Sequence, residues 1–137
     1  MRRYIVDASA WIDYFRGTPR GKSVKQLILP PGKAVEIITP TITLAELKKH
    51  YVKENLEGFD QDMENVRLLS NRIPDLDWRT AIRAGELHAH RKNRDIGIVD
   101  CILLAVAEMD RGKVLSLDGH FKRRPEAMYI GGKQELS

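Results

Sequence analysis

A chain of 137 residues with 42% hydrophobic and 31% charged residues has the composition of a globular protein, which excludes fibrous and disordered classes. Its longest apolar stretch, residues 101–107, is far shorter than the about 20 residues that span a bilayer, so no membrane class is expected. The net charge of +4 is a weak bias toward polyanionic partners such as nucleic acids.

The N-terminus and the cysteine content indicate a cytoplasmic protein. The apolar run at residues 4–6 stops at Asp7 before any signal-peptide core develops. The single Cys101 has no partner for an internal disulfide and lies in an apolar helical pattern, which predicts a buried thiol. We therefore expect one domain over residues 1–137, in a reducing compartment.

The first half of the chain alternates short β-branched runs with helical periodicity. Strands are expected over residues 4–6 and 35–38, and helices over 9–16, 22–29, 43–51 and 59–69. Ser9 is the expected N-cap of the first helix, and Gly17 ends that helix. Thr43 begins the third helix, which we expect to form a hairpin with the fourth around Gly58.

The second half continues this alternation. Strands are expected over residues 73–76, 114–117 and 127–130, and helices over 77–93 and 98–109. Asp77 is the expected N-cap of the first of these helices. Pro74 lacks the amide that a central strand must donate, so its segment is placed at a sheet edge. Alternating strands and helices predict a layered α/β domain with a mostly parallel sheet.

Four carboxylates occupy positions where predicted strands end or helices begin: Asp7, Glu46, Asp100 and Asp118. In an open parallel sheet these positions line one edge, where ligands bind. Clustered carboxylates repel one another unless a cation lies between them, and Mg²⁺ prefers oxygen ligands of this kind. Such a cation can activate water and stabilise charge on a phosphoryl group, which suggests phosphate chemistry.

Each acid also has a simpler structural interpretation. Asp7 and Asp100 could stabilise helix N-termini through the helix dipole. Thr43 and Glu46 match the spacing of a capping box, and Asp118 precedes a glycine, as in an ordinary turn. The metal hypothesis rests on the four acids together.

Other candidate residues carry weaker signals. His88 and His90 are two positions apart on a predicted helix, so they face different directions and do not suggest a shared metal. His120 follows Asp118 closely and is expected to be a peripheral substrate contact. The basic runs at 91–94 and 122–124 are typical of solvated surface, and phosphate contacts are an equal alternative.

Motifs of several other enzyme classes are absent from the sequence. It has no glycine-rich dinucleotide fingerprint, no Walker phosphate loop, no nucleophile elbow and no cysteine and histidine set spaced for zinc. An aspartyl phosphatase would need a second aspartate two residues after Asp7, where this chain has Ser9.

The segments that hold the acids resemble those of PIN-domain ribonucleases, particularly the VapC-like toxins of type II toxin-antitoxin systems. The similar segments are IVDASAWI at 5–12, AEL at 45–47, IVDCILLA at 98–105 and LSLDGHF at 115–121. Together with the similar length, they extend the resemblance over the whole chain. It implies a three-layer domain with a mostly parallel five-stranded sheet flanked by helices.

The resemblance also implies roles for these residues. The four acids would be catalytic and would hold one or two Mg²⁺ or Mn²⁺ ions. Ser116 would support Asp118, and Ser9 would orient Asp7 or contact the substrate. His120 stands where family members often carry a further acid, which bears on a second metal.

A metal-dependent endoribonuclease acting as a toxin is therefore the first functional hypothesis. The resemblance implies an RNA substrate, a cognate antitoxin that blocks the site, and a homodimer. Two alternatives remain open, namely a PIN-domain RNA-processing nuclease without an antitoxin, and a non-catalytic PIN-like scaffold that binds RNA or protein. Clustered acids argue against a scaffold, because it gains nothing from their repulsion.

Overall fold

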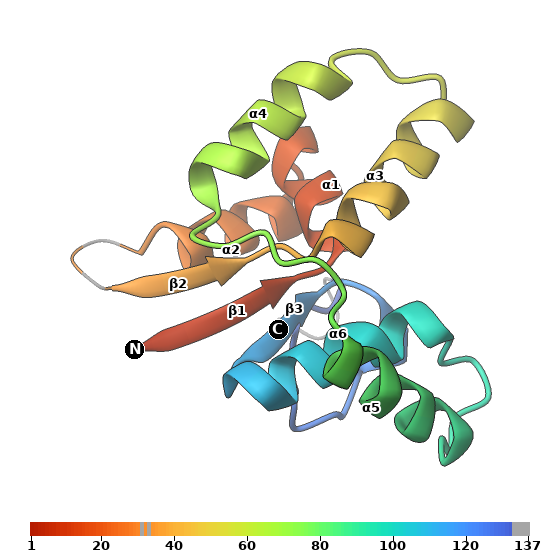
Figure 1. Ribbon diagram of the computed structural model, residues 1–137. Helices are drawn as coiled ribbons and strands as arrows, with labels where there is room; N and C mark the ends of the chain where they lie inside the picture. The colour runs from red at the N-terminus through yellow and green to blue at the C-terminus, as the bar shows by residue number, and fades with distance from the viewer. Residues whose placement is uncertain (31, 33, 133–137) are drawn as a thin grey trace.

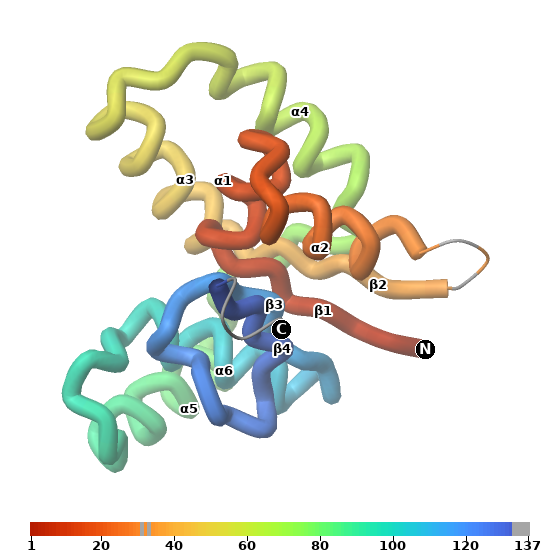
Figure 2. Tube along the Cα trace, turned by 180° about the vertical axis from the view of Figure 1, so that it is seen from behind, coloured from red at the N-terminus to blue at the C-terminus, as the bar shows by residue number. Residues whose placement is uncertain are grey.

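The computed structural model describes residues 1–30, 32 and 34–132 and centres on a parallel β-sheet (Figure 1). Its strands are β1 (Arg2–Val6), β2 (Val35–Ile38), β3 (Lys113–Ser116) and β4 (Ala127–Tyr129), in the order β2-β1-β3-β4. All three strand pairs are parallel, and β1 lies between β2 and β3. Figure 2 shows β4 beside β3, at the edge opposite β2.

The strand expected over residues 73–76 does not form. In its place, Arg72 alone makes a parallel bridge to Ile38, at the predicted edge beside β2. The carbonyl of Pro74 instead accepts a hydrogen bond from the Thr41 amide, 3.0 Å away. Within the described ranges the sheet therefore has four strands in place of the five expected, because a proline without an amide hydrogen cannot extend the ladder.

Helices cover both faces of the sheet. They are α1 (Ala8–Arg16), α2 (Pro19–Ile28), α3 (Thr41–Lys53), α4 (Phe59–Leu69), α5 (Trp78–Ala89) and α6 (Ile98–Asp110), with a short 3₁₀ helix, η1 (Gly119–Phe121). Figure 1 shows α1 to α4 on one side and α5 and α6 on the other. This arrangement confirms the layered α/β prediction.

Alternation along the strands explains the two covered faces. In β1, Tyr4 and Val6 belong to the core cluster that includes Trp11 of α1 and Leu47 of α3. Ile5 points the other way and belongs to the cluster of α6 side chains. Because successive strand side chains face opposite sides, a strand buried on both sides reads as a continuous apolar run.

Two predicted helix starts are wrong. Asp7, not Ser9, caps α1: its Oδ1 accepts a hydrogen bond from the Ala8 amide at 2.7 Å. α3 begins at Thr41, after Pro40, so Thr43 lies inside the first turn and is buried. The expected capping box of Thr43 with Glu46 therefore does not form, which removes the structural interpretation of Glu46.

Other local predictions are confirmed. Gly17 ends α1 with a left-handed backbone (φ 67°), a conformation that glycine adopts without strain. Asp77 caps α5 through the Thr80 amide at 2.8 Å, although that helix ends at Ala89. Cys101 is buried. Within the described ranges, no helix is long and apolar enough to cross a membrane.

Candidate metal centre

The carboxyl ends of β1 and β3 form the centre of the candidate site. The chain leaves β1 toward β2 on one side, whereas β3 pairs with β1 on the other side. Asp7 follows β1 directly, and its amide donates to the Leu115 carbonyl of β3 at 3.0 Å. A position between two strands from which the chain departs in opposite directions is where open α/β sheets place ligands.

All four predicted acids line one cleft at this point. The cleft has a volume of about 330 Å³, and it is bordered by side chains of α1, α3 and α6 and by Asp118. The acids come from four segments: Asp7 from the end of β1, Glu46 from α3, Asp100 from the first turn of α6 and Asp118 from the turn after β3. The tertiary structure thus brings together residues that are up to 111 positions apart, from Asp7 to Asp118.

Two serines hold the Asp7 carboxylate. Ser116 Oγ donates to Asp7 Oδ2 at 2.7 Å, and Ser9 Oγ donates to the same oxygen at 3.0 Å. The two hydroxyl oxygens are 3.1 Å apart. Each also accepts a backbone amide, from Asp118 for Ser116 (2.9 Å) and from Leu117 for Ser9 (3.0 Å). The serines therefore fix Asp7 relative to the turn that carries Asp118.

Burial raises the pKa of the Asp7 carboxyl above its ordinary value of 3.8. The hydrogen bonds from Ser116 and Ser9 lower this pKa in part, because they stabilise the charged form. The negative charge of Asp100 raises it further. Asp7 thus bears an unfavourable charge that a nearby cation would stabilise.

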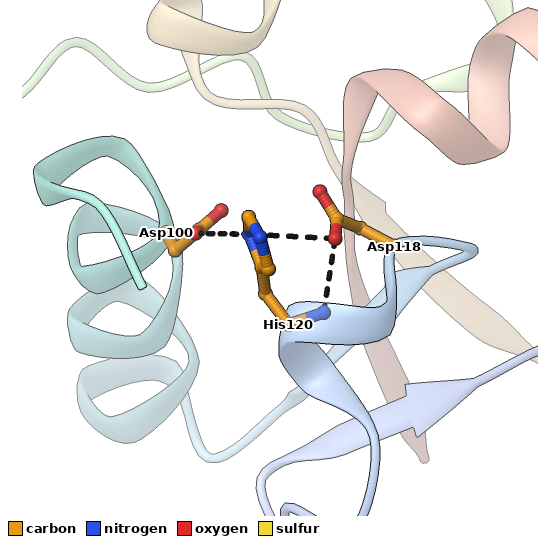
Figure 3. Close-up of side chains that lie close together, drawn as sticks. All are labelled: Asp100, Asp118 and His120. Atoms are coloured by element: carbon orange, nitrogen blue, oxygen red, sulfur yellow. Dashed lines mark hydrogen bonds and ion pairs between the residues drawn. The ribbon is translucent and has the colours of Figure 1, made fainter. Parts of the chain in front are cut away.

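His120 joins two of the other acids (Figure 3). Its Nδ1 lies 3.0 Å from Asp100 Oδ2 and 3.4 Å from Asp118 Oδ1. One ligand atom from each of these three residues lies within 4.8 Å of the others. The sequence predicted only a peripheral substrate contact for His120, and the structure adds that its ring lies between the two carboxylates, where η1 places it.

Asp100 and Asp118 also have the local roles that their positions suggested. Asp100 Oδ2 accepts the Gly97 amide at 3.1 Å, at the start of α6. Asp118 Oδ1 accepts the His120 amide at 2.9 Å, at the start of η1. These contacts hold the carboxylates in place without excluding a ligand, because a carboxylate has about four acceptor sites.

The family of the chain is decided by a match over most of its length. The profile of the PIN domain matches residues 4–127, a range that includes all four acids and both serines. The chain belongs to the PIN domain family. No curated protein matches it by sequence.

Solved structures share the fold of this PIN domain. A toxin-antitoxin complex from Klebsiella pneumoniae is 22% identical, with a TM-score of 0.69 over 95% of this chain and 100% of that one. The sarcin-ricin loop cleaving toxin VapC20 of Mycobacterium tuberculosis is 20% identical, with a TM-score of 0.70 over 90% and 96% of the two chains. The DNA-bound VapBC of Salmonella typhimurium is 20% identical, with a TM-score of 0.65 over 96% and 98%.

The side of the cleft formed by α3 contains residues that the sequence analysis did not predict as site residues. Lys49 and Lys53 line the cleft together with Glu46 and His50. These residues are spaced at i, i+3, i+4 and i+7 along α3, so they share one helix face. The spacing was visible in the sequence, but only the position of α3 over the strand ends directs this face to the acids. By contrast, His88 and His90 do not line the cleft.

The residues of this PIN domain fit a divalent cation. The cleft supplies carboxylate oxygens from four side chains, and hard cations prefer such ligands. Over the described ranges, none of the four acids forms an ion pair with a lysine or arginine side chain. The negative charge of Asp100 raises the pKa of Asp7, and a cation bound between the two carboxylates would offset this repulsion.

Proposed function

We propose that this PIN domain is a divalent-metal-dependent endoribonuclease. The observation that carries the proposal is the meeting of four carboxylates, from four distant segments, in one cleft whose α3 wall contributes two lysines. The four acids Asp7, Glu46, Asp100 and Asp118 would hold Mg²⁺ or Mn²⁺. A cation bound there would activate water and stabilise negative charge on the phosphoryl group.

The remaining cleft residues position the acids and the substrate. Ser9 and Ser116 keep the Asp7 carboxylate oriented through the hydrogen bonds described above. Lys49 and Lys53 would bind backbone phosphates, because their ammonium groups neutralise charge and contact any sequence equally well. Such contacts would fix the register of the strand relative to the acids and leave base selection to other residues.

Cleavage of RNA by purified protein tests this proposal. Wild type and Asp100→Asn are incubated with a pool of structured and single-stranded RNAs in Mg²⁺, Mn²⁺ or EDTA. Asp75→Asn is the matched control, since Asp75 is exposed and lies outside the cleft. We expect cleavage by wild type and Asp75→Asn with metal, and none by Asp100→Asn or in EDTA.

Two results would contradict the proposal. Equal cleavage by wild type and Asp100→Asn would assign the activity to a contaminant. No cleavage by a folded wild type that binds the metal would favour the non-catalytic scaffold. Metal binding is measured separately, by the shift of the thermal unfolding midpoint on adding Mn²⁺.

We further propose that the nuclease is the toxin of a toxin-antitoxin pair, with an antitoxin that covers the cleft. Support comes from the similar folds of the Klebsiella pneumoniae toxin-antitoxin complex and the Salmonella typhimurium VapBC. A small upstream reading frame with a DNA-binding pattern is expected beside the gene. Its product should copurify with this chain and suppress cleavage; an isolated gene would favour an RNA-processing nuclease. Sedimentation of the free protein tests the expected homodimer.

A further inference from the structure

A second hollow, separate from the cleft, lies beside the first turn of α6. It has a volume of about 350 Å³, and its lining includes Arg91, Lys92, Cys101 and Arg124. We call it the basic hollow. Asp100 lines the cleft, and the next residue, Cys101, lines the basic hollow. Two consecutive residues in the first turn of α6 thus line two different sites.

Two guanidinium groups of the basic hollow have buried donors without acceptors. Arg91 Nε and Arg124 Nε are buried, and neither has a hydrogen-bond partner among the residues that the structure describes. Arg124 Nε lies 3.8 Å from Glu126 Oε2, which is too long for a hydrogen bond. Buried donors are normally satisfied, and arginine has only donors, so only an acceptor can satisfy these two groups.

The Arg91 side chain is held in place for such a partner. Its Nη1 donates to the His88 carbonyl at 2.7 Å, which anchors the guanidinium at the end of α5. An anchored arginine loses less conformational freedom when it binds a ligand than a freely moving one.

The charges around the basic hollow favour an anion. Arg83 also lines it, but a bidentate pair with Glu108 at 2.7 and 3.0 Å engages that guanidinium. Among the described residues, Arg91 and Lys92 form no ion pair, and Arg124 has one long ion pair, with Nε 3.8 Å from Glu126 Oε2; Glu86 is the acid among the lining residues.

We propose that the basic hollow binds a backbone phosphate of the RNA strand whose scissile phosphate lies in the cleft. The proposal rests on the nuclease function proposed above and adds a binding subsite to it. A phosphate offers several acceptor oxygens to two guanidinium groups, and guanidinium matches phosphate geometry. A single strand carries one phosphate per nucleotide, so a strand that crosses the first turn of α6 presents phosphates to both sites.

RNA binding in EDTA tests the subsite without requiring cleavage. The variant is Arg91→Gln with Arg124→Gln, and affinity for a labelled single-stranded RNA is measured over a range of salt concentrations. The matched control is Arg2→Gln with Lys113→Gln, which removes the same charge from a basic pocket at the opposite ends of the strands. Circular dichroism confirms that each variant is folded.

We expect the hollow variant to bind RNA about tenfold more weakly than the control, with the slope of log K against log salt reduced by about 0.7 for each phosphate that the protein no longer neutralises. Equal affinity and slope in the two double variants would overturn the proposal. Polyglutamate is measured in parallel. A loss of polyglutamate binding as large as the loss of RNA binding would assign the hollow to an acidic protein partner and also overturn it.

The unmodified protein provides a second readout that does not depend on variant folding. The Nε–H signals of Arg91 and Arg124 are followed by ¹H–¹⁵N NMR during titration with the same RNA or with inorganic phosphate. We expect RNA to shift both signals at concentrations where inorganic phosphate does not. No shift with RNA, or equal shifts with both ligands, would contradict a subsite for an RNA strand.

The cleavage assay separates this proposal from the nuclease function. If wild type cleaves RNA and the hollow variant binds and cleaves like the control, only the basic hollow proposal fails. If wild type does not cleave but the hollow variant binds RNA more weakly, the nuclease proposal fails and the hollow remains a phosphate site for bound RNA.

Discussion

Ser116 Oγ and Asp7 Oδ2 lie 2.7 Å apart, although 109 positions separate the two residues in the sequence. This contact joins the ends of two neighbouring strands. Ser116 Oγ also accepts the Asp118 amide at 2.9 Å, so one hydroxyl positions two candidate metal ligands. Groups that orient metal ligands in this way commonly influence metal affinity.

Ser116→Ala should weaken metal binding and destabilise the fold. It leaves the Asp118 amide and one oxygen of Asp7 short of a partner, which costs about 1–3 kcal/mol of unfolding free energy. We expect Mn²⁺ affinity to fall about 10–100-fold. Isothermal titration with Mn²⁺ and urea unfolding measure the two effects.

Ser23→Ala is the control for this prediction. Ser23 Oγ makes one exposed contact of 3.4 Å to the Pro19 carbonyl, far from the cleft lining. Removing the Ser23 hydroxyl should change neither the Mn²⁺ affinity nor the unfolding free energy. Equal metal affinity in Ser116→Ala and Ser23→Ala would show that the serine does not position the ligands.

Without metal, the stability of Asp7→Asn relative to wild type should increase as the pH rises. Because the native state raises the pKa of Asp7, the stability contributed by this carboxyl is complete below about pH 3.8 and is lost as the pH rises through the raised value. Asparagine stays neutral and does not lose this contribution. The unfolding free energy of the variant in EDTA, relative to wild type, should therefore increase from acidic to neutral pH.

Urea unfolding in EDTA at several pH values tests this prediction. Asp75→Asn, at an exposed position, should show no such trend. If Asp7→Asn were less stable than wild type by the same amount at every pH, the expected rise of its relative stability with pH would be contradicted. At neutral pH, adding Mn²⁺ should make wild type more stable than Asp7→Asn, because only wild type retains the Asp7 ligand.

His120→Asp should shift the metal preference toward Mg²⁺. His120 Nδ1 is one of three ligand atoms within 4.8 Å of one another. Mg²⁺ prefers oxygen, whereas later first-row metals such as Ni²⁺ accept imidazole more readily. The ratio of Ni²⁺ to Mg²⁺ affinity should fall by about tenfold, a size typical of changes at metal sites.

Calorimetric titration with each metal measures this ratio. His88→Asp, on α5 and outside the cleft lining, is the matched control and should keep the ratio of wild type. An unchanged ratio in His120→Asp would mean that the imidazole lies near the cation without binding it.

Tyr51→Phe should loosen the pairing of α3 with α4. The Tyr51 hydroxyl donates to Asp62 Oδ2 at 2.6 Å, and its ring contacts Phe59 with centroids 5.3 Å apart. Loss of this hydrogen bond to a carboxylate should lower the unfolding free energy by about 1.5–3 kcal/mol. Urea unfolding measures this loss of unfolding free energy.

Tyr14→Phe is the control, because no hydrogen bond of the Tyr14 hydroxyl occurs among the described residues while its ring packs against Trp11. This variant should be close to wild type in stability. A loss in Tyr51→Phe no larger than in Tyr14→Phe would contradict a stabilising role of the Asp62 contact.

Local sequence patterns predicted most of the elements because these depend on neighbouring residues. The apolar run at 4–6, the helical period that Gly17 ends and the cap at Asp77 all appear in the structure. The predicted starts at Ser9 and Thr43 were wrong for the same reason. Capping rules consider only neighbouring residues, whereas the Ser9 hydroxyl accepts the amide of Leu117, which is 108 positions away, while it donates to Asp7.

The sequence by itself determined the alternation of most strands and helices and the presence of four acids at or near the ends of these elements. These follow from side-chain periodicity and backbone preferences, which are local properties. Only the tertiary structure decided that the lysines of α3 share the cleft and that His120 lies between Asp100 and Asp118. It also decided that the Nε donors of Arg91 and Arg124 are buried without partners within the described part of the chain. Such relationships depend on how distant elements pack, because burial and charge proximity are properties of the assembled layers.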